Sequence, residues 1–255
     1  MTLVSAHRGG VGRERRREGT LASIDEASRL GVDLVEIDVR VLADGSTVLQ
    51  HDPTTRLRGR RRAVSSLDLA TFRASTGRAT FDEALGLLAG RAGAHVDLKS
   101  DPTSDLAGSP PQWAVGTARR AVERLGAAHV VVTSEDDAVV AAVRAWSRAA
   151  APGLRVGLSM QRAPGGPDRE RVRGALADRL AACDATLVVA HHRLARTHLA
   201  AVADGAGLPM LVWTVDRTRD LAYWLDDRAW AVTTNRPATA LRVRDALRPS
   251  SETAR

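Results

Sequence analysis

Eight short apolar runs recur along the chain, and longer segments with a helical spacing of apolar residues separate them. The runs cover residues 3–9, 34–40, 94–100, 129–134, 155–160, 186–192, 210–215 and 230–235. Their apolar positions are nearly continuous instead of alternating, which is typical of strands covered on both faces. We therefore expect parallel strands buried between helices.

The segments between these runs carry helix signals. Residues 20–31 begin with a Thr suited to the N-cap and end at a Gly, and residues 134–150 open with Ser and an acidic first turn. Further helices are expected over 110–126, 168–182, 194–206, 217–226 and 238–247. Eight strands, most of them followed by a helix, predict an α/β fold of the (β/α)8 type, a TIM barrel, instead of a doubly wound sheet.

Residues 43–80 interrupt this alternation. They contain a turn at ADGS, a strand TVLQHD, the basic run RLRGRRR and a helix at SLDLATFRAST. We interpret them as a small insertion after strand 2 that lies over the C-terminal mouth of the barrel. No repeat or linker divides the chain, so we expect one domain over 1–248 and a disordered tail over 249–255.

The basic side chains are almost all arginine, because Lys99 is the only lysine among 37 Lys and Arg residues. A net charge of +7 favours anionic partners, and a solvated basic surface explains it equally well. The basic segments 12–17 and 56–62 flank the expected mouth and could attract anionic lipid head groups. They lack interleaved aromatic residues, so nucleic acid is not an expected partner.

The chain shows no secretory signal and no apolar stretch approaching a membrane span. We therefore expect a cytoplasmic protein without a transmembrane segment. The single cysteine, Cys183, excludes an intramolecular disulfide. The sequence does not indicate an oligomeric state.

Chemically active side chains gather at the ends of the expected strands, where barrels place functional groups. These are His7 and Arg8, Glu36 and Asp38, His51 and Asp52, Asp97 and Lys99, His191 and His192, and Trp213. Alternation puts Glu36 and Asp38 on one strand face, and Asp97 and Lys99 on another.

If those faces point inward, three carboxylates and one ammonium converge at the mouth. Three adjacent carboxylates need a compensating cation, and ligation by oxygen alone suits Mg2+ or Ca2+. For either acidic pair alone, an ordinary charged strand end is the better explanation. The two pairs together, with histidines on other strand ends, favour a divalent cation site.

Several motifs resemble, in order, those of the glycerophosphodiester phosphodiesterase family. The chain has AHRGG, EGT, VEIDVRVLADGSTVLQHD, DLK, WTVD and TTNRP between about residues 3 and 237. The family pattern is HRG, P-E-N-T, E-x-D, a D-G turn, HD, E-x-K, W-T-V-N and T-D/N-x-P. The first block, from HRG to HD, is the specific part of the resemblance.

This resemblance implies a metal-dependent enzyme that hydrolyses small glycerophosphodiesters to glycerol phosphate and an alcohol. Glu36, Asp38 and Asp97 would hold the metal, and His7 and His51 would be the general acid/base pair. Arg8 and Lys99 would neutralise phosphate oxygens, while Trp213 and His191 would contact the substrate. Glu18 and Asp52 would contact these groups without touching the metal or the substrate, and Asp52 would orient His51.

Three departures from the family pattern leave alternatives open. Arg17 and Gly19 replace Pro and Asn in P-E-N-T, which is R-E-G-T here, and Asp97 replaces the more common Glu. The alternatives are a lysophospholipase D-like phosphodiesterase and a catalytically weakened barrel that binds an anionic ligand. For His95 we expect a hydrogen-bonded core histidine, and for Asn235 either substrate contact or stabilisation of a turn.

Overall fold

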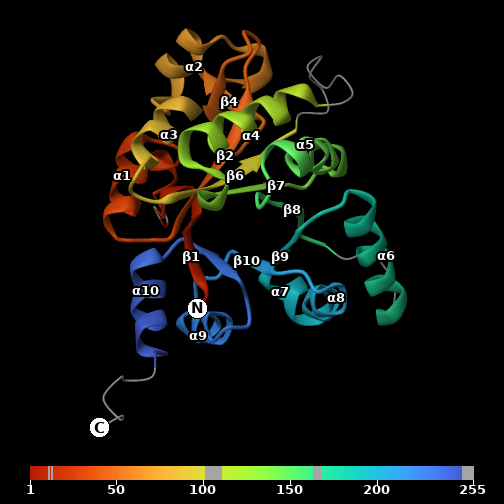
Figure 1. Cartoon of the computed structure of the whole chain (residues 1–255). Helices are drawn as coiled ribbons and strands as arrows, with labels where there is room; N and C mark the ends of the chain where they lie inside the picture. Colours follow the sequence, from red (N-terminus) through yellow and green to blue (C-terminus); the bar gives the residue numbers. More distant parts are fainter. Residues whose placement is uncertain (11, 13, 101–110, 163–167, 249–255) are drawn as a thin grey trace.

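The barrel closes through eight parallel strands (Figure 1). The computed structural model describes residues 1–10, 12, 14–100, 111–162 and 168–248. The barrel strands are β1 (Leu3–Ala6), β2 (Leu34–Val41), β6 (Gly93–Leu98), β7 (Val130–Ser134), β8 (Arg155–Met160), β9 (Leu187–His191), β10 (Met210–Trp213) and β11 (Ala231–Thr234). They pair in the order β1-β11-β10-β9-β8-β7-β6-β2, and β1 also pairs with β2. The prediction of a TIM barrel is confirmed.

Helices cover the outside of the barrel (Figure 1). They are α1 (Leu21–Arg29), α3 (Phe81–Leu88), α4 (Gln112–Leu125), α5 (Asp137–Ala150), α6 (Arg169–Ala182), α7 (His192–Leu194), α8 (Ala200–Ala206), α9 (Thr218–Leu225) and α10 (Pro237–Ala246). Thr20 caps α1 at the predicted start by accepting from the Ser23 amide. The start of α5 differs from the expected Ser134, because Asp136 is the cap and accepts from the Ala138 amide, while Ser134 ends β7. A single π-helical turn, Ala195–Leu199, joins α7 to α8.

The barrel strands bury both faces, and their apolar side chains form two separate clusters, a large one and a small one that includes Leu34, Val131 and Leu187. All five residues of β7 are buried, and so are seven of the eight residues of β2. The register between β2 and β6 pairs Glu36 with His95 and Asp38 with Asp97. Polar side chains on the inner faces of these two strands therefore meet inside the barrel.

The predicted insertion after strand 2 is confirmed, and its details differ from expectation. β3 (Thr47–Leu49) pairs antiparallel with β2, and α2 (Leu69–Thr76) begins three residues later than the expected helix and ends where it was expected to end. The basic run is no loop, because β4 (Thr54–Leu57) and β5 (Arg60–Ala63) form an antiparallel hairpin. A separate small core holds the insertion together: Leu42, Val48, Val64, Leu67 and Phe72.

Two expectations concern the chain as a whole. None of the helices in the described ranges is long and apolar enough to cross a membrane. The expected tail, 249–255, lies outside the described residues, as do residues 11 and 13 near the first basic segment.

Candidate active site

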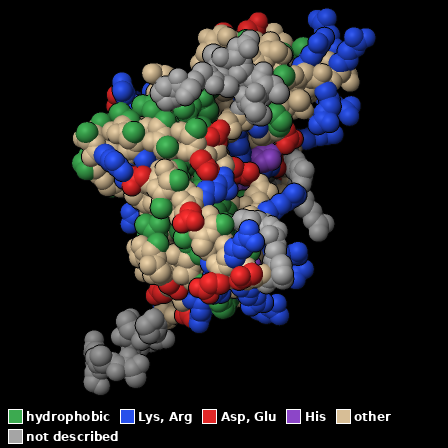
Figure 2. All heavy atoms as spheres, turned by 90° about the vertical axis from the view of Figure 1, so that its right-hand side faces the viewer, with side chains coloured by type: hydrophobic (Ala, Val, Ile, Leu, Met, Phe, Trp, Pro, Cys, Tyr) green, Lys and Arg blue, Asp and Glu red, His purple; other side chains and the backbone are tan. Residues whose placement is uncertain are grey.

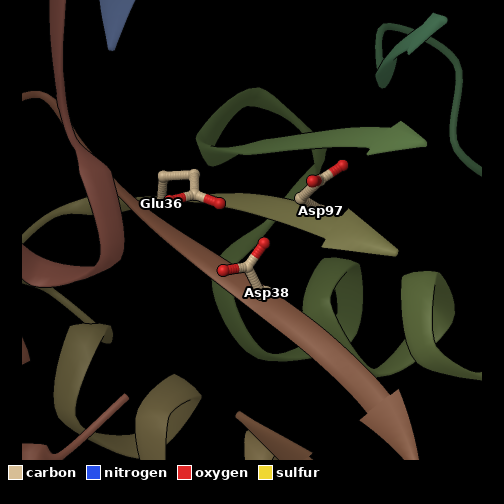
Figure 3. Close-up of side chains that lie close together, drawn as sticks. All are labelled: Glu36, Asp38 and Asp97. Atoms are coloured by element: carbon tan, nitrogen blue, oxygen red, sulfur yellow. The ribbon is translucent and has the colours of Figure 1, made fainter. Parts of the chain in front are cut away.

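Three carboxylates meet at the C-terminal end of the barrel strands (Figure 3). Glu36 and Asp38 project from the same face of β2, and Asp97 projects from the neighbouring strand β6. One oxygen from each carboxylate lies within 4.8 Å of an oxygen from the others. The three carboxylates therefore converge as predicted, and two of them, Glu36 and Asp38, are buried from water.

Two cationic side chains lie against this carboxylate cluster. The Lys99 ammonium is 3.1 Å from Asp38 Oδ1 and forms a close ion pair with Asp97. Arg8 Nε is 2.9 Å from Asp38 Oδ2. Burial alone would raise the pKa of Asp38, but Lys99 and Arg8 outweigh it and hold the pKa at about 2. Asp38 is therefore ionised at neutral pH.

Glu36 has the opposite balance. Burial, followed by repulsion from Asp38 and Asp97, raises the pKa of Glu36 well above its ordinary value. The negative charge of the cluster thus exceeds what Lys99 and Arg8 compensate. Oxygen donors with surplus negative charge match the preference of a hard divalent cation, so these residues fit Mg2+ or Ca2+. Within the described residues, this is the only group of three or more acidic, His or Cys ligands with such spacing.

A hydrogen-bond chain orients His7. Its Nδ1 is 2.7 Å from Asn235 Oδ1, while the Asn235 side-chain amide and backbone amide both donate to the Asp216 carboxylate. Because Asn235 offers its oxygen to His7, Nδ1 carries the proton and Nε2 is free to accept one. Burial, aided by Arg8, lowers the pKa of His7, so its imidazole is neutral at pH 7.

The Arg8 backbone requires the two glycines that follow it. Arg8 itself has a φ of 50°, and Gly9 and Gly10 also have positive φ. A Cβ on Gly9 would lie 2.8 Å from Ser23 Oγ, and one on Gly10 would lie 2.6 Å from Pro237 Cγ. This tight turn points the Arg8 amide at Glu36 Oε2, 2.8 Å away, and its guanidinium at Glu18, 3.2 Å away.

His51 lies just beyond the end of β3, the first strand of the insertion. Its Nδ1 is 2.8 Å from Asp52 Oδ1, which leaves Nε2 free. Arg40 donates two hydrogen bonds to the His51 carbonyl, at 2.8 and 3.0 Å. His51, whose imidazole is half-exposed, is therefore held both at its backbone carbonyl and at its ring.

A cavity of about 210 Å³ joins these groups. The predicted residues in its lining are His7, Arg8, Glu36, Asp38, His51, Asp97, Lys99 and Trp213. Three further predicted residues do not line it but contact residues that do. Glu18 reaches the cavity through Arg8, Asp52 reaches it through His51, and His191 packs edge-on against Trp213 at 5.5 Å between ring centroids.

The sequence reasoning missed several polar residues of this cavity. Thr133 donates to Asp97 Oδ1 at 2.8 Å and also bonds the buried His95, which agrees with the expectation of a hydrogen-bonded core histidine. Glu135 and Gln161 line the cavity and bond each other. Each of these two residues directly follows a run of β-branched or apolar residues, which is the signal that could have identified them.

The departures at positions 19 and 97 leave this geometry intact. Gly19 has a φ of 70°, a left-handed conformation that Asn and Gly adopt more readily than other residues. The neighbouring Thr20 still caps α1, and Glu18 still reaches Arg8. Asp97, one methylene shorter than Glu, still brings an oxygen within reach of Glu36 and Asp38.

Comparison with known proteins identifies relatives of the whole barrel. Residues 7–239 match the family model described as "Glycerophosphoryl diester phosphodiesterase family". No curated protein matches the chain.

Solved structures share the fold. A protein of Silicibacter pomeroyi superposes with a TM-score of 0.78 at 24% identity, over 97% of this chain and 94% of the other. A glycerophosphodiester phosphodiesterase of Agrobacterium tumefaciens gives 0.70 at 22% identity, over 96% and 100%. A phosphodiesterase of Oleispira antarctica, in complex with the product sn-glycerol-3-phosphate, gives 0.71 at 19% identity, over 96% and 97%.

Proposed function

Since the chain belongs to the glycerophosphoryl diester phosphodiesterase family, we propose that it hydrolyses glycerophosphodiesters to glycerol phosphate and an alcohol with one divalent cation. The observation that carries this proposal is the convergence on one cavity of the carboxylate cluster, the cationic Arg8 and Lys99, and the imidazoles of His7 and His51. A phosphodiester is anionic, and positive charge must offset the charge that builds on its oxygens during hydrolysis.

Glu36, Asp38 and Asp97 would hold the cation. When bound, it would neutralise phosphoryl oxygens and make a coordinated hydroxyl more acidic. Arg8 and Lys99 would supply the rest of the positive charge. Both already lie against Asp38, so they are in place before the substrate arrives.

The two histidines have different surroundings, which suggests different roles. His7 is neutral and presents an unprotonated Nε2, so it would accept the proton of the attacking hydroxyl. His51 is more exposed than His7, and the Asp52 carboxylate orients its ring through Nδ1, so we assign to His51 the protonation of the leaving alcohol. In the reaction we infer, the glycerol 2-hydroxyl attacks first, and water then opens the cyclic phosphate.

The size of the cavity supports a small polar substrate. About 210 Å³ accommodates a glycerol phosphate moiety, with the leaving alcohol directed toward the open mouth. The Oleispira antarctica structure holds sn-glycerol-3-phosphate on the same fold. We therefore propose glycerol phosphate as the common product, whatever the leaving alcohol.

The test is turnover of a panel of glycerophosphodiesters with Mg2+ or Ca2+, and with chelator as the control. We expect His7→Ala and His51→Ala each to reduce kcat by about 10²–10⁴-fold, while calorimetry still detects cation binding. His129→Ala is the matched control, because His129 is exposed just before β7, at the other end of the barrel.

Other outcomes would favour the alternatives. Activity on detergent-dispersed lysolipids, with none on water-soluble diesters, would favour the lysophospholipase D-like reaction. Tight ligand binding without turnover under either cation would favour a binding protein. Near-normal turnover in His7→Ala would refute the proposed roles.

A further inference from the structure

A second hollow lies beside the proposed catalytic cavity, bordered by the hairpin of the insertion. We call it the arginine groove, and its charged lining is Arg16, Arg56, Arg61, Arg78 and Asp52. Its volume is about 740 Å³, larger than the cavity itself. Four guanidiniums and one carboxylate give a formal charge of +3 (four minus one), so the groove attracts anions.

The hairpin places two of these arginines directly opposite each other. The β4–β5 register pairs Arg56 with Arg61, and both side chains are exposed. Like charges at directly opposed positions destabilise an antiparallel pair. Among the described residues, no carboxylate forms an ion pair with any of the four groove arginines. An anion bound between Arg56 and Arg61 would relieve the repulsion, because guanidinium binds phosphate in bidentate fashion.

Arg78 connects the groove to the catalytic cavity. It is half-buried, its guanidinium donates to the side chain of Gln50, and burial lowers its pKa. Arg78 also lines a narrow recess together with Arg8 and His51. Asp52 lines the groove and accepts from His51. The groove therefore begins beside His51, the proposed general acid.

We propose that the arginine groove binds a second phosphate carried by the leaving alcohol. The preferred substrates are then glycerophosphodiesters whose alcohol portion is itself phosphorylated. This inference rests on the proposed function, since it assumes that the cleaved phosphate lies near Arg8 and Lys99. Lys and Arg side chains gather at the upper right of Figure 2, at the height where Figure 1 draws α2 and β4.

A matched pair of substrates tests the preference. Glycerophosphoglycerol and its terminal phosphate monoester differ only in the second phosphate. We expect kcat/KM to be about tenfold or more higher for the phosphorylated compound, with the advantage shrinking as salt rises. In the double variant Arg56→Gln/Arg61→Gln, the ratio of the two kcat/KM values falls toward one. An unchanged ratio in this variant overturns the inference.

The same hairpin supplies a control of equal charge. Arg60 and Arg62 alternate with Arg61 along β5, are exposed, and do not belong to the groove lining. Arg60→Gln/Arg62→Gln removes two positive charges from the neighbouring positions. We expect it to keep the wild-type ratio, whereas an equal loss in both double variants would mean that net charge, and not the groove, sets the preference.

Calorimetry separates failure of this inference from failure of the proposed hydrolysis. The two compounds are titrated into His7→Ala protein with and without Arg56→Gln/Arg61→Gln. Tighter binding of the phosphorylated compound, by about tenfold or more and lost in the groove variant, supports the groove even if nothing is turned over. Equal affinities overturn it. Binding to phosphatidylglycerol vesicles that both double variants weaken equally, without preference between the compounds, assigns the arginines to a membrane surface and also overturns it.

Discussion

The ammonium of Lys99 is shared between two carboxylates, and this geometry explains a lysine in an otherwise arginine-only chain. Lys99 contacts Asp38 and Asp97 inside a mostly buried cluster. Attraction to these acids outweighs burial and raises the pKa of Lys99. A compact ammonium with three donors suits two acceptors at one point, whereas a planar guanidinium presents a broad fork.

Lys99→Arg therefore tests whether the site needs the compact shape of the ammonium, because the substitution keeps the positive charge. We expect kcat/KM on a glycerophosphodiester to fall by about 10²-fold or more, because the guanidinium displaces Asp97 or the phosphate. The activity assay is paired with a thermal melt to check folding. Arg162→Lys, at an exposed position, is the control for exchanging these side chains. Undiminished activity of Lys99→Arg would mean that composition alone explains the lysine.

Asp216 is linked to His7 through Asn235, and the orientation of His7 depends on this link. The Asp216 carboxylate accepts from Thr234 Oγ1, the Asn235 amide and Asn235 Nδ2. An Asn at this position would turn an amide nitrogen toward at least one of these donors. We expect Asp216→Asn to lower kcat by about 10–100-fold with little change in KM, and to shift the pH profile of kcat. Asp226→Asn, at an exposed residue, is the control. A wild-type kcat and pH profile would remove Asp216 from this role.

Among the secondary-structure elements, the barrel strands could be predicted and parts of the insertion could not. A strand covered on both faces has a continuous apolar run, and β7 (VVVTS) is buried throughout. The β4–β5 hairpin has no such run, because Arg60, Arg61 and Arg62 fill its second strand. Arg58 and Gly59 at its turn both have positive φ, which favours a hairpin. The pattern of apolar residues does not predict it.

Helix α3 was also missed, for a different reason. Thr80 and Glu83 form a capping box, a signal that is visible in the sequence. This eight-residue helix begins directly where the expected insertion ends, at residue 80, and no separate apolar run marks it in the sequence. Such a short helix is stabilised by packing, here through the buried Phe81, Leu85 and Leu88, more than by its own propensity.

The local stability of the insertion should fall at acidic pH, because two ionised aspartates accept hydrogen bonds that stabilise it. Asp44 accepts from the backbone amides of Leu69 and Ser46, and Asp68 caps α2 by accepting from the Thr71 amide. These hydrogen bonds lower the pKa of both carboxyls below the ordinary 3.8. A lowered pKa in the folded state means that the stabilisation is present above about pH 4 and is lost as pH falls through the folded-state pKa.

We therefore expect amide exchange at Leu69 and Thr71 to accelerate, relative to the intrinsic rate, below about pH 4, before exchange in the β7 strand does. Asp44→Asn/Asp68→Asn should exchange faster at neutral pH and lose most of this acid dependence. Hydrogen exchange followed by mass spectrometry measures both. Simultaneous acceleration in α2 and β7 would mean that the insertion and the barrel open as one unit.

At the scale of the whole molecule, ring closure assembles a site whose residues are distant in sequence. The strand ends could be predicted one by one, and inward-facing acids followed from alternation along β2 and β6. The link from Asp216 through Asn235 to His7 depends on the pairing of β1 with β11, the first and last strands. No local sequence pattern encodes that closure, so this part of the site required the fold.

Closure of the barrel also brings the three carboxylates of the cluster together. Because a cation bound there binds only the folded state, it should stabilise the entire barrel. A ligand that binds only the folded state adds about 2.7 kcal/mol at a hundredfold excess over its Kd. We expect Mg2+ or Ca2+ to raise Tm by several degrees and chelator to reverse the rise, as measured by calorimetry. No shift with either ion would argue against a divalent site at Glu36, Asp38 and Asp97.

Glu36→Gln should separate the effect of a bound cation on Tm from the effect of the carboxylate cluster itself. We expect it to raise Tm in the presence of chelator and to reduce the rise in Tm that divalent ions produce. Burial and the repulsion of Asp38 and Asp97 disfavour the Glu36 carboxylate, as its raised pKa indicates. A neutral Gln keeps an acceptor for the Arg8 amide and removes that repulsion. The chelated variant should therefore melt above the chelated wild type, while added divalent ions shift its Tm little or not at all. Glu123→Gln, on the exposed side of α4, should leave both values unchanged. A chelated Glu36→Gln protein that melts below the wild type would mean that Glu36 stabilises the barrel without a cation, through its contact with Arg8.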